Sequence, residues 1–143
     1  MRTAQLLDKH LETKGLSRAD RWLYILVGGV KIPYVPIWPI RHFLIAHDLH
    51  HFITGYPTTI LGEVYLLGWE LASGGWARHN WWYWVKVIHV PLAFLYSPAG
   101  IWQALKAGSK RHNLYRFDTD ELLEMEFDDA IYYVEHGALP AHT

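Results

Sequence analysis

The sequence of 143 residues contains no cysteine, which excludes a disulfide scaffold, thiol catalysis and any cysteine-ligated zinc or iron–sulfur site. It also lacks an excess of basic charge, because 13 Lys and Arg stand against 14 Asp and Glu. Without such an excess, a protein has little of the attraction to phosphate backbones that non-specific nucleic-acid binding requires. We therefore expect no nucleic-acid partner, and any metal site must use nitrogen and oxygen ligands.

Acidic residues are scarce in the middle of the chain. Residues 21–105 contain only three of them, Asp48, Glu63 and Glu70, although the same segment holds all eight tryptophans. An aromatic-rich and acid-poor composition is typical of a tryptophan-rich core, of the wall of an apolar ligand channel, or of a bilayer interface. Because 51% of the residues are hydrophobic, we expect residues 1–143 to form a single domain around one core.

The sequence also lacks a clear membrane-spanning run or targeting segment. Residues 87–105 carry no Lys, Arg, Asp or Glu, but Pro91 and Pro98 remove backbone donors from this stretch, so we expect it to be buried or interfacial. The first 14 residues have no continuous apolar run, and Asp8 and Glu12 interrupt them. We therefore predict neither a signal peptide nor a transit peptide, and the cytoplasmic side is the default location.

Helical spacing of apolar residues and capping signals predict an all-α fold, a compact multi-helix bundle. No strand alternation is sustained, and we interpret residues 22–38, with their glycines and prolines, as the end of a helix followed by an irregular loop that faces a membrane. The expected helices are residues 6–14, 17–27, 40–54, 58–73, 78–95, 98–108 and 118–136. Capping pairs mark two of the helix starts, Ser17 with Asp20 and Asp118 with Glu121, and Thr58 or Thr59 is the candidate N-cap for residues 58–73.

The candidate chemistry lies in residues 47–63. On a helix, His47 and His51 lie one turn apart on one face, with Asp48 beside them. A Gly-Tyr-Pro turn follows and lets the next helix fold back antiparallel, which brings Glu63 to the same face. Two imidazoles and two carboxylates suit one divalent ion, zinc, iron or manganese, and the spacing does not choose among them.

Each of these residues also has a structural interpretation. Asp48 could instead cap the helix or pair with Arg41, which would leave the histidines as core or surface residues. Glu70 lies on the same helical face as Glu63, where it could orient a ligand or accept a proton, or be solvated or paired with a basic residue such as Arg78. His50 lies on the flank of the ligand arc, either around the metal site or exposed to solvent.

At these residues the chain resembles the Coq-four family of ubiquinone (coenzyme Q) biosynthesis proteins. That family has an HDxxH box, eleven further residues and then Glu, which here are His47, Asp48, His51 and, after eleven residues, Glu63. The intervening positions Gly55, Pro57, Thr58, Leu61 and Gly62 also resemble the family. The likeness is clear over about residues 40–75 and is faint in the C-terminal third.

The resemblance implies an all-helical homodimer with a metal beside an apolar channel for a polyprenyl chain. Its expected partners are a prenylated aromatic lipid, the membrane surface and other quinone-pathway enzymes. The activity implied is oxidative decarboxylation, in which a hydroxyl replaces the ring carboxylate of a polyprenyl hydroxybenzoate. His47, Asp48, His51 and Glu63 would then act through the metal, with His50 and Glu70 around them.

Two other interpretations remain open. The family commonly has an arginine just ahead of the His-Asp pair, and this chain has Leu44 there, which favours a lipid-binding scaffold with a structural metal. His47, His50 and His51 also spell HxxHH, like one box of the di-iron lipid hydroxylases, although those enzymes need several boxes. An open coordination position would favour the enzyme, because structural metal sites are closed.

Overall fold

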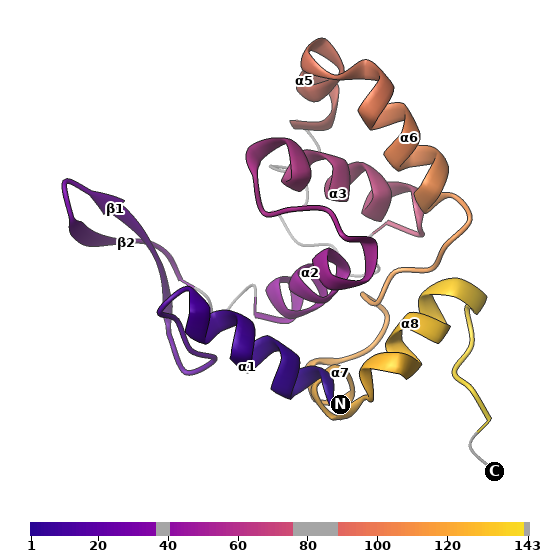
Figure 1. Cartoon of the computed structure of the whole chain (residues 1–143), viewed down its shortest axis with the longest axis horizontal. Helices are drawn as coiled ribbons and strands as arrows, with labels where there is room; N and C mark the ends of the chain where they lie inside the picture. Colours follow the sequence, from indigo (N-terminus) through magenta and orange to yellow (C-terminus); the bar gives the residue numbers. More distant parts are fainter. Residues whose placement is uncertain (37–40, 76–88, 142–143) are drawn as a thin grey trace.

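The computed structural model describes residues 1–36, 41–75 and 89–141, and nothing below concerns the rest of the chain. Seven helices and one two-stranded sheet make up this part (Figure 1). The helices are α1 (Thr3–Thr13), α2 (Arg41–Thr54), α3 (Ile60–Ala72), α5 (His89–Tyr96), α6 (Pro98–Gly108), α7 (Thr119–Glu124) and α8 (Phe127–His136). The strands are β1 (Trp22–Val27) and β2 (Val30–Pro36). The predicted helical bundle is therefore confirmed for most of the described chain.

Helices α2 and α3 end and begin where the sequence predicted. Gly55 follows α2 with φ at 76°, a conformation that glycine adopts without steric cost. The Thr59 side chain then caps α3 by accepting a hydrogen bond from the Gly62 amide. A Cβ at residue 62 would overlap the backbone carbonyl of Pro57, so only glycine lets this turn lie close against α3. The short turn holds the two helices that carry the candidate ligands.

Two groups of buried apolar side chains lie on either side of α3. The larger joins α1, α2, α3, α7, α8 and the loop before α7, and its fully buried members include Leu7, Leu49, Leu66 and Leu114. The smaller lies between α3, α5 and α6 and is built around Leu67 and Ile101. Helix α3 is the element common to both, so it is held from two sides. This packing on both sides of α3 fixes the positions of its two glutamates, Glu63 and Glu70.

The predicted C-terminal helix is divided into two. Its start is confirmed, because Asp118 and Glu121 form the predicted capping box at α7. Met125 and Glu126 are extended, however, and separate α7 from α8. At this break the chain pairs with its own N-terminus: the Thr3 amide donates to the Met125 carbonyl, and the Phe127 amide donates to the Met1 carbonyl. Backbone groups that would continue the helix are used instead to hold α1.

The prediction of a helix over residues 17–27 and an irregular loop to residue 38 is wrong in the described part. Residues 22–36 form an antiparallel hairpin in which Val27 pairs with Val30. Gly28 and Gly29 form the turn with φ at 59° and 83°, as a two-residue type I′ turn requires. Two runs of β-branched and aromatic residues separated by Gly-Gly are a hairpin signal, and the helical interpretation overlooked it.

The structure describes one of the remaining predicted helices completely and another only in part. Helix α6 begins at Pro98 and ends at Gly108, as predicted. The predicted helix over residues 78–95 falls largely outside the described residues, and its described part is α5, which continues to Tyr96. Among the described residues, no helix is both long enough and apolar enough to cross a lipid bilayer.

Candidate metal centre

Three side chains from α2 and α3 converge at one point. His47 and His51 lie one turn apart on α2, and Glu63 lies in the first turn of α3. One ligand atom from each lies within 4.8 Å of the others. The Nε2 atoms of His47 and His51 lie 2.9 and 3.1 Å from the two carboxylate oxygens of Glu63. This is the one such group among the described residues, and its two imidazoles and one carboxylate are a common set of ligands for zinc and ferrous iron.

A backbone carbonyl orients His51. Its Nδ1 lies 2.8 Å from the carbonyl oxygen of Tyr56, and since a carbonyl can only accept, Nδ1 carries the hydrogen. In the neutral imidazole the lone pair is then on Nε2, which faces Glu63. The turn between α2 and α3 thereby fixes both the tautomer and the direction of this ring.

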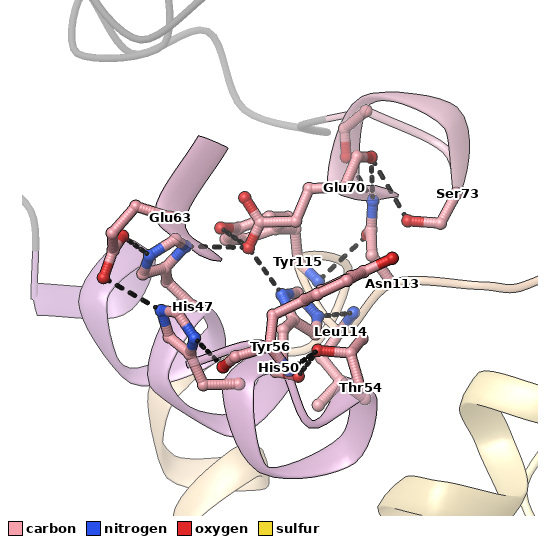
Figure 2. A network of polar contacts seen from close by, with 12 residues as sticks. His47, His50, Thr54, Tyr56, Glu63, Glu70, Ser73, Asn113, Leu114 and Tyr115 are labelled. Carbon is pink, nitrogen blue, oxygen red and sulfur yellow. Dashed lines mark hydrogen bonds and ion pairs between the residues drawn. The ribbon is translucent and has the colours of Figure 1, made fainter. Parts of the chain in front are cut away.

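A buried carboxylate orients His47 in the same way. Its Nδ1 donates to Oε1 of Glu70 over 2.9 Å, which leaves Nε2 directed at Glu63. Figure 2 shows the His47 ring between the two glutamates. A carboxylate behind a histidine sets the tautomer and raises the basicity of a metal-ligating imidazole. Both histidines therefore present an Nε2 lone pair to the same point.

Glu70 is fully buried, and one of its oxygens accepts three hydrogen bonds. Besides His47, its Oε1 accepts from Nδ1 of His50 at 2.8 Å and from the Tyr115 hydroxyl at 2.7 Å. Among the described residues no partner meets its other oxygen, Oε2. A carboxylate at this depth needs such partners, because burial of an unpaired charge is costly. Of the predictions for Glu70, the orienting role fits this arrangement and the solvated face does not, and the predicted partner Arg78 lies outside the described residues.

His50 is held as a neutral ring within this network. The Leu114 amide donates to its Nε2 over 2.9 Å, so that nitrogen is an acceptor, while Nδ1 donates to Glu70. Burial lowers the pKa of the His50 imidazole, and the hydrogen bond and charge of Glu70 only partly offset this. Both ring nitrogens are engaged inside the protein. A di-iron box of the HxxHH type would need His50 as a ligand, which this arrangement does not provide.

The two glutamates carry negative charge at the site. Burial raises the pKa of the Glu63 carboxyl, but the hydrogen bonds and positive charge of His47 and His51 outweigh it, and the net pKa lies well below the ordinary value. Burial likewise raises the pKa of Glu70, and the charge and hydrogen bonds of His47 and His50 bring it well below its usual range. The two ionised carboxylates call for positive charge nearby, which the imidazoles of His47 and His51 supply when protonated and a divalent ion would supply when they are neutral.

The site is open on the side of Glu63. The side chains of His47 and His51 are 5% and 7% exposed, whereas that of Glu63 is 38% exposed. The three candidate ligands among the described residues would leave at least one position of a four- or five-coordinate ion for water or another ligand.

The structure places Asp48, the predicted fourth ligand, outside this group. Its side chain lines a cavity of about 150 Å³ whose wall includes Leu7 and Leu11 of α1 and Arg41 of α2. A second cavity, of about 230 Å³, lies on another side of α2 and includes Thr54 and Glu135 in its wall. Neither cavity is lined by the three candidate ligands. The apolar channel expected from the resemblance remains a prediction.

Sequence reasoning missed three groups at the site. Tyr115, the Leu114 amide and the Tyr56 carbonyl all orient the ring system, and the first two lie far along the chain from α2. Two of the three are backbone groups, which have no signature in the residue types. Tyr115 has no spacing relation to the histidines, so nothing in the sequence marked it. Comparison with protein-family models, curated proteins and solved structures returns no match to this chain.

Proposed function

We propose that this chain binds one divalent metal ion through His47, His51 and Glu63 and uses it to transform an acidic aromatic lipid. One observation carries the metal assignment: two imidazoles, each fixed through Nδ1 by an acceptor, direct Nε2 at one carboxylate. With both rings neutral, two Nε2 lone pairs would face an ionised carboxylate at 2.9 and 3.1 Å, and a divalent ion between them would replace that repulsion by attraction. The donor set suits zinc or ferrous iron, and manganese less well.

The substrate class follows from the open side of the site and from the sequence. A bound divalent ion would act as a Lewis acid toward the carboxylate or phenolate of a substrate at its open position. The acid-poor, tryptophan-rich segment of residues 21–105 supports an apolar partner for the rest of the substrate. The resemblance at residues 47–63 supports a polyprenyl hydroxybenzoate as that substrate, within a quinone-biosynthesis route shared with other enzymes.

The reaction proposed is an oxidative decarboxylation. The bond between the ring carbon and the carboxyl breaks and carbon dioxide leaves, while a new bond joins that ring carbon to a hydroxyl oxygen. With dioxygen as oxidant and a two-electron donor, the second oxygen atom leaves as water. In this scheme His47 and His51 hold the ion, and Glu70 holds His47 in the ligating tautomer. Glu63, the most exposed of the three, lies beside the position where substrate enters.

The first experiment counts metal ions on the purified chain. We expect about one divalent ion per chain by elemental analysis after purification without chelator, and loss of that ion in His51→Ala. Asp48→Asn is the matched control, because Asp48 is on the same helix but lies outside the group. Undiminished metal in His51→Ala, or equal loss in both variants, would contradict the assignment.

The second experiment tests the reaction on the metal-loaded chain. A prenylated hydroxybenzoate labelled with ¹³C at the carboxyl should release labelled carbon dioxide and yield the ring hydroxyl under air with a reductant. His51→Ala should release none. Metal binding without turnover would reject the enzyme and favour the second candidate, a lipid-binding scaffold with a structural metal. The observation favouring that candidate is that neither described cavity reaches the ligands.

A further inference from the structure

The β1–β2 hairpin exposes apolar side chains. Val27 and Val30, which flank the turn, are 54% and 63% exposed, and Trp22 and Ile32 are 42% and 41% exposed. Val27 pairs with Val30 across the strands and Ile32 lies two residues beyond Val30, so these three side chains share one face. A hairpin in water normally packs its apolar face on a core. These exposed side chains therefore call for a partner.

The described helices do not cover the hairpin. Figure 1 shows it extending away from the helical body, and each strand packs mainly against the other strand among the described elements. An isolated two-stranded hairpin is marginally stable in water. Its apolar surface therefore has to be covered by something outside the described chain.

The charge around the hairpin indicates what covers it. Residues 21–47 contain no Asp or Glu, and their three basic residues are Arg21 before β1, Lys31 next to the turn and Arg41 after β2. Trp22 stands at the start of β1, beside Arg21. Basic residues flanking an apolar segment, with tryptophan at the boundary, are complementary to a bilayer surface that contains anionic lipids.

We propose that the β1–β2 hairpin inserts its tip into the interfacial layer of an anionic lipid bilayer. The exposed Val27 and Val30 side chains would enter the acyl boundary, and the positive charges at positions 21 and 31 of the sequence would favour anionic lipids. The inference is independent of the metal centre, because no residue of the hairpin belongs to that site.

A second copy of the chain is a poorer partner for this hairpin. Strand β2 contains Pro33 and Pro36, which have no amide hydrogen to offer to an incoming strand. Prolines on an edge strand protect natural sheets from edge-to-edge pairing. A lipid surface needs no such hydrogen bonds from the edge of the strand.

The absence of cysteine makes a direct test possible. V30C and L139C each introduce a single thiol, which can carry a polarity-sensitive dye. Leu139, like Val30, is an exposed apolar residue, but it lies near the C-terminus. With vesicles of phosphatidylcholine and phosphatidylglycerol, the dye at residue 30 should shift to shorter wavelength, and the dye at residue 139 should not. An unshifted dye at residue 30, or equal shifts at both positions, would overturn the proposal.

Charge variants then separate the hairpin from other apolar surfaces. Val27→Asp with Val30→Asp should reduce binding to the same vesicles by at least about tenfold, because burial of each valine is lost and two acids are added. Leu95→Asp, on the exposed side of α5, is the control and should bind like the parent. Lys31→Gln should weaken binding about fivefold. If Leu95→Asp abolishes binding and the hairpin pair does not, the membrane face lies on α5 instead.

The oligomeric state of the same variants tests the alternative partner. If Val27→Asp with Val30→Asp converts a dimer to a monomer in solution by light scattering, and vesicle binding is absent in the parent, a second copy covers the hairpin. That result would overturn the lipid proposal. An unchanged mass together with lost vesicle binding supports it.

Discussion

The metal centre and the hairpin arrange polar and apolar groups in opposite ways. In the centre, ionisable side chains are buried, and Glu70 at its base is met by His47, His50 and Tyr115. In the hairpin, valines and a tryptophan face outward without cover from the helices. The first region explains its own stability, because each buried charge has partners inside the chain. The second has exposed apolar side chains that the proposed lipid surface would cover.

The largest effect is expected where the centre loses its buried charge. Glu70→Ala leaves the Nδ1 donors of His47 and His50 and the Tyr115 hydroxyl without their acceptor. We expect the free energy of unfolding to fall by about 3–5 kcal/mol, as it does for other buried pairs from which one partner is removed. Denaturant titration measures this free energy. Glu70→Gln keeps an acceptor oxygen and should cost clearly less, and equal costs for the two would show that the hydrogen bonds contribute little.

Metal should stabilise the centre by mass action. A divalent ion at about 100 times its dissociation constant should raise the unfolding free energy by about 2.7 kcal/mol. The measurement is thermal unfolding with and without added zinc or iron. Asp48→Asn should keep this gain and Glu63→Gln should lose it, because only Glu63 belongs to the ligand group. A gain that survives in Glu63→Gln would place the ion elsewhere.

Acid should weaken the centre through its glutamates. The pKa values of Glu63 and Glu70 lie below the ordinary carboxyl value of 4.5, so their stabilising contribution is present above that value and is lost as the pH falls through the lowered values. The unfolding temperature of the parent should therefore drop on acidification below about pH 4.5. Glu70→Gln should show a shallower drop, and identical slopes would contradict the ionised state of Glu70.

The smallest effect on stability is expected at the hairpin tip. Val27→Thr with Val30→Thr changes exposed side chains that contact no helix core, so the unfolding free energy should stay within about 0.5 kcal/mol of the parent. Metal content should be unchanged, while vesicle binding should weaken. A loss of stability as large as that of Glu70→Ala would show that the hairpin is part of the folded core.

Local sequence signals predicted the helix ends that have capping residues or an N-terminal proline. The Thr59 cap of α3, the Pro98 start of α6 and the Asp118 capping box were visible in the residue types, because caps act within three or four residues. The break between α7 and α8 was not visible. It depends on pairing with Met1 and Thr3, which lie more than a hundred residues away in the sequence.

The hairpin was mispredicted for a different reason. Ser17 and Asp20 looked like the start of a helix, and the Ser17 amide does donate to Asp20, but the pair closes only a turn. A capping pair shows where a helix can begin and does not make the following residues helical. The β-branched and aromatic residues after it, with Gly28 and Gly29, favour strands and a type I′ turn.

By itself the sequence determined the pair of histidines on one helical face and the glutamate beyond a glycine-proline turn, because a 3.6-residue period and a short turn leave little freedom. Only the tertiary structure decided which flank of α2 faces the centre. It turned His50 toward Glu70 and Asp48 toward α1, although both lie beside the same two histidines. His50 and Asp48 lie on the same helix, but α3 packs on one side of α2 and α1 on the other, so the two side chains meet different partners.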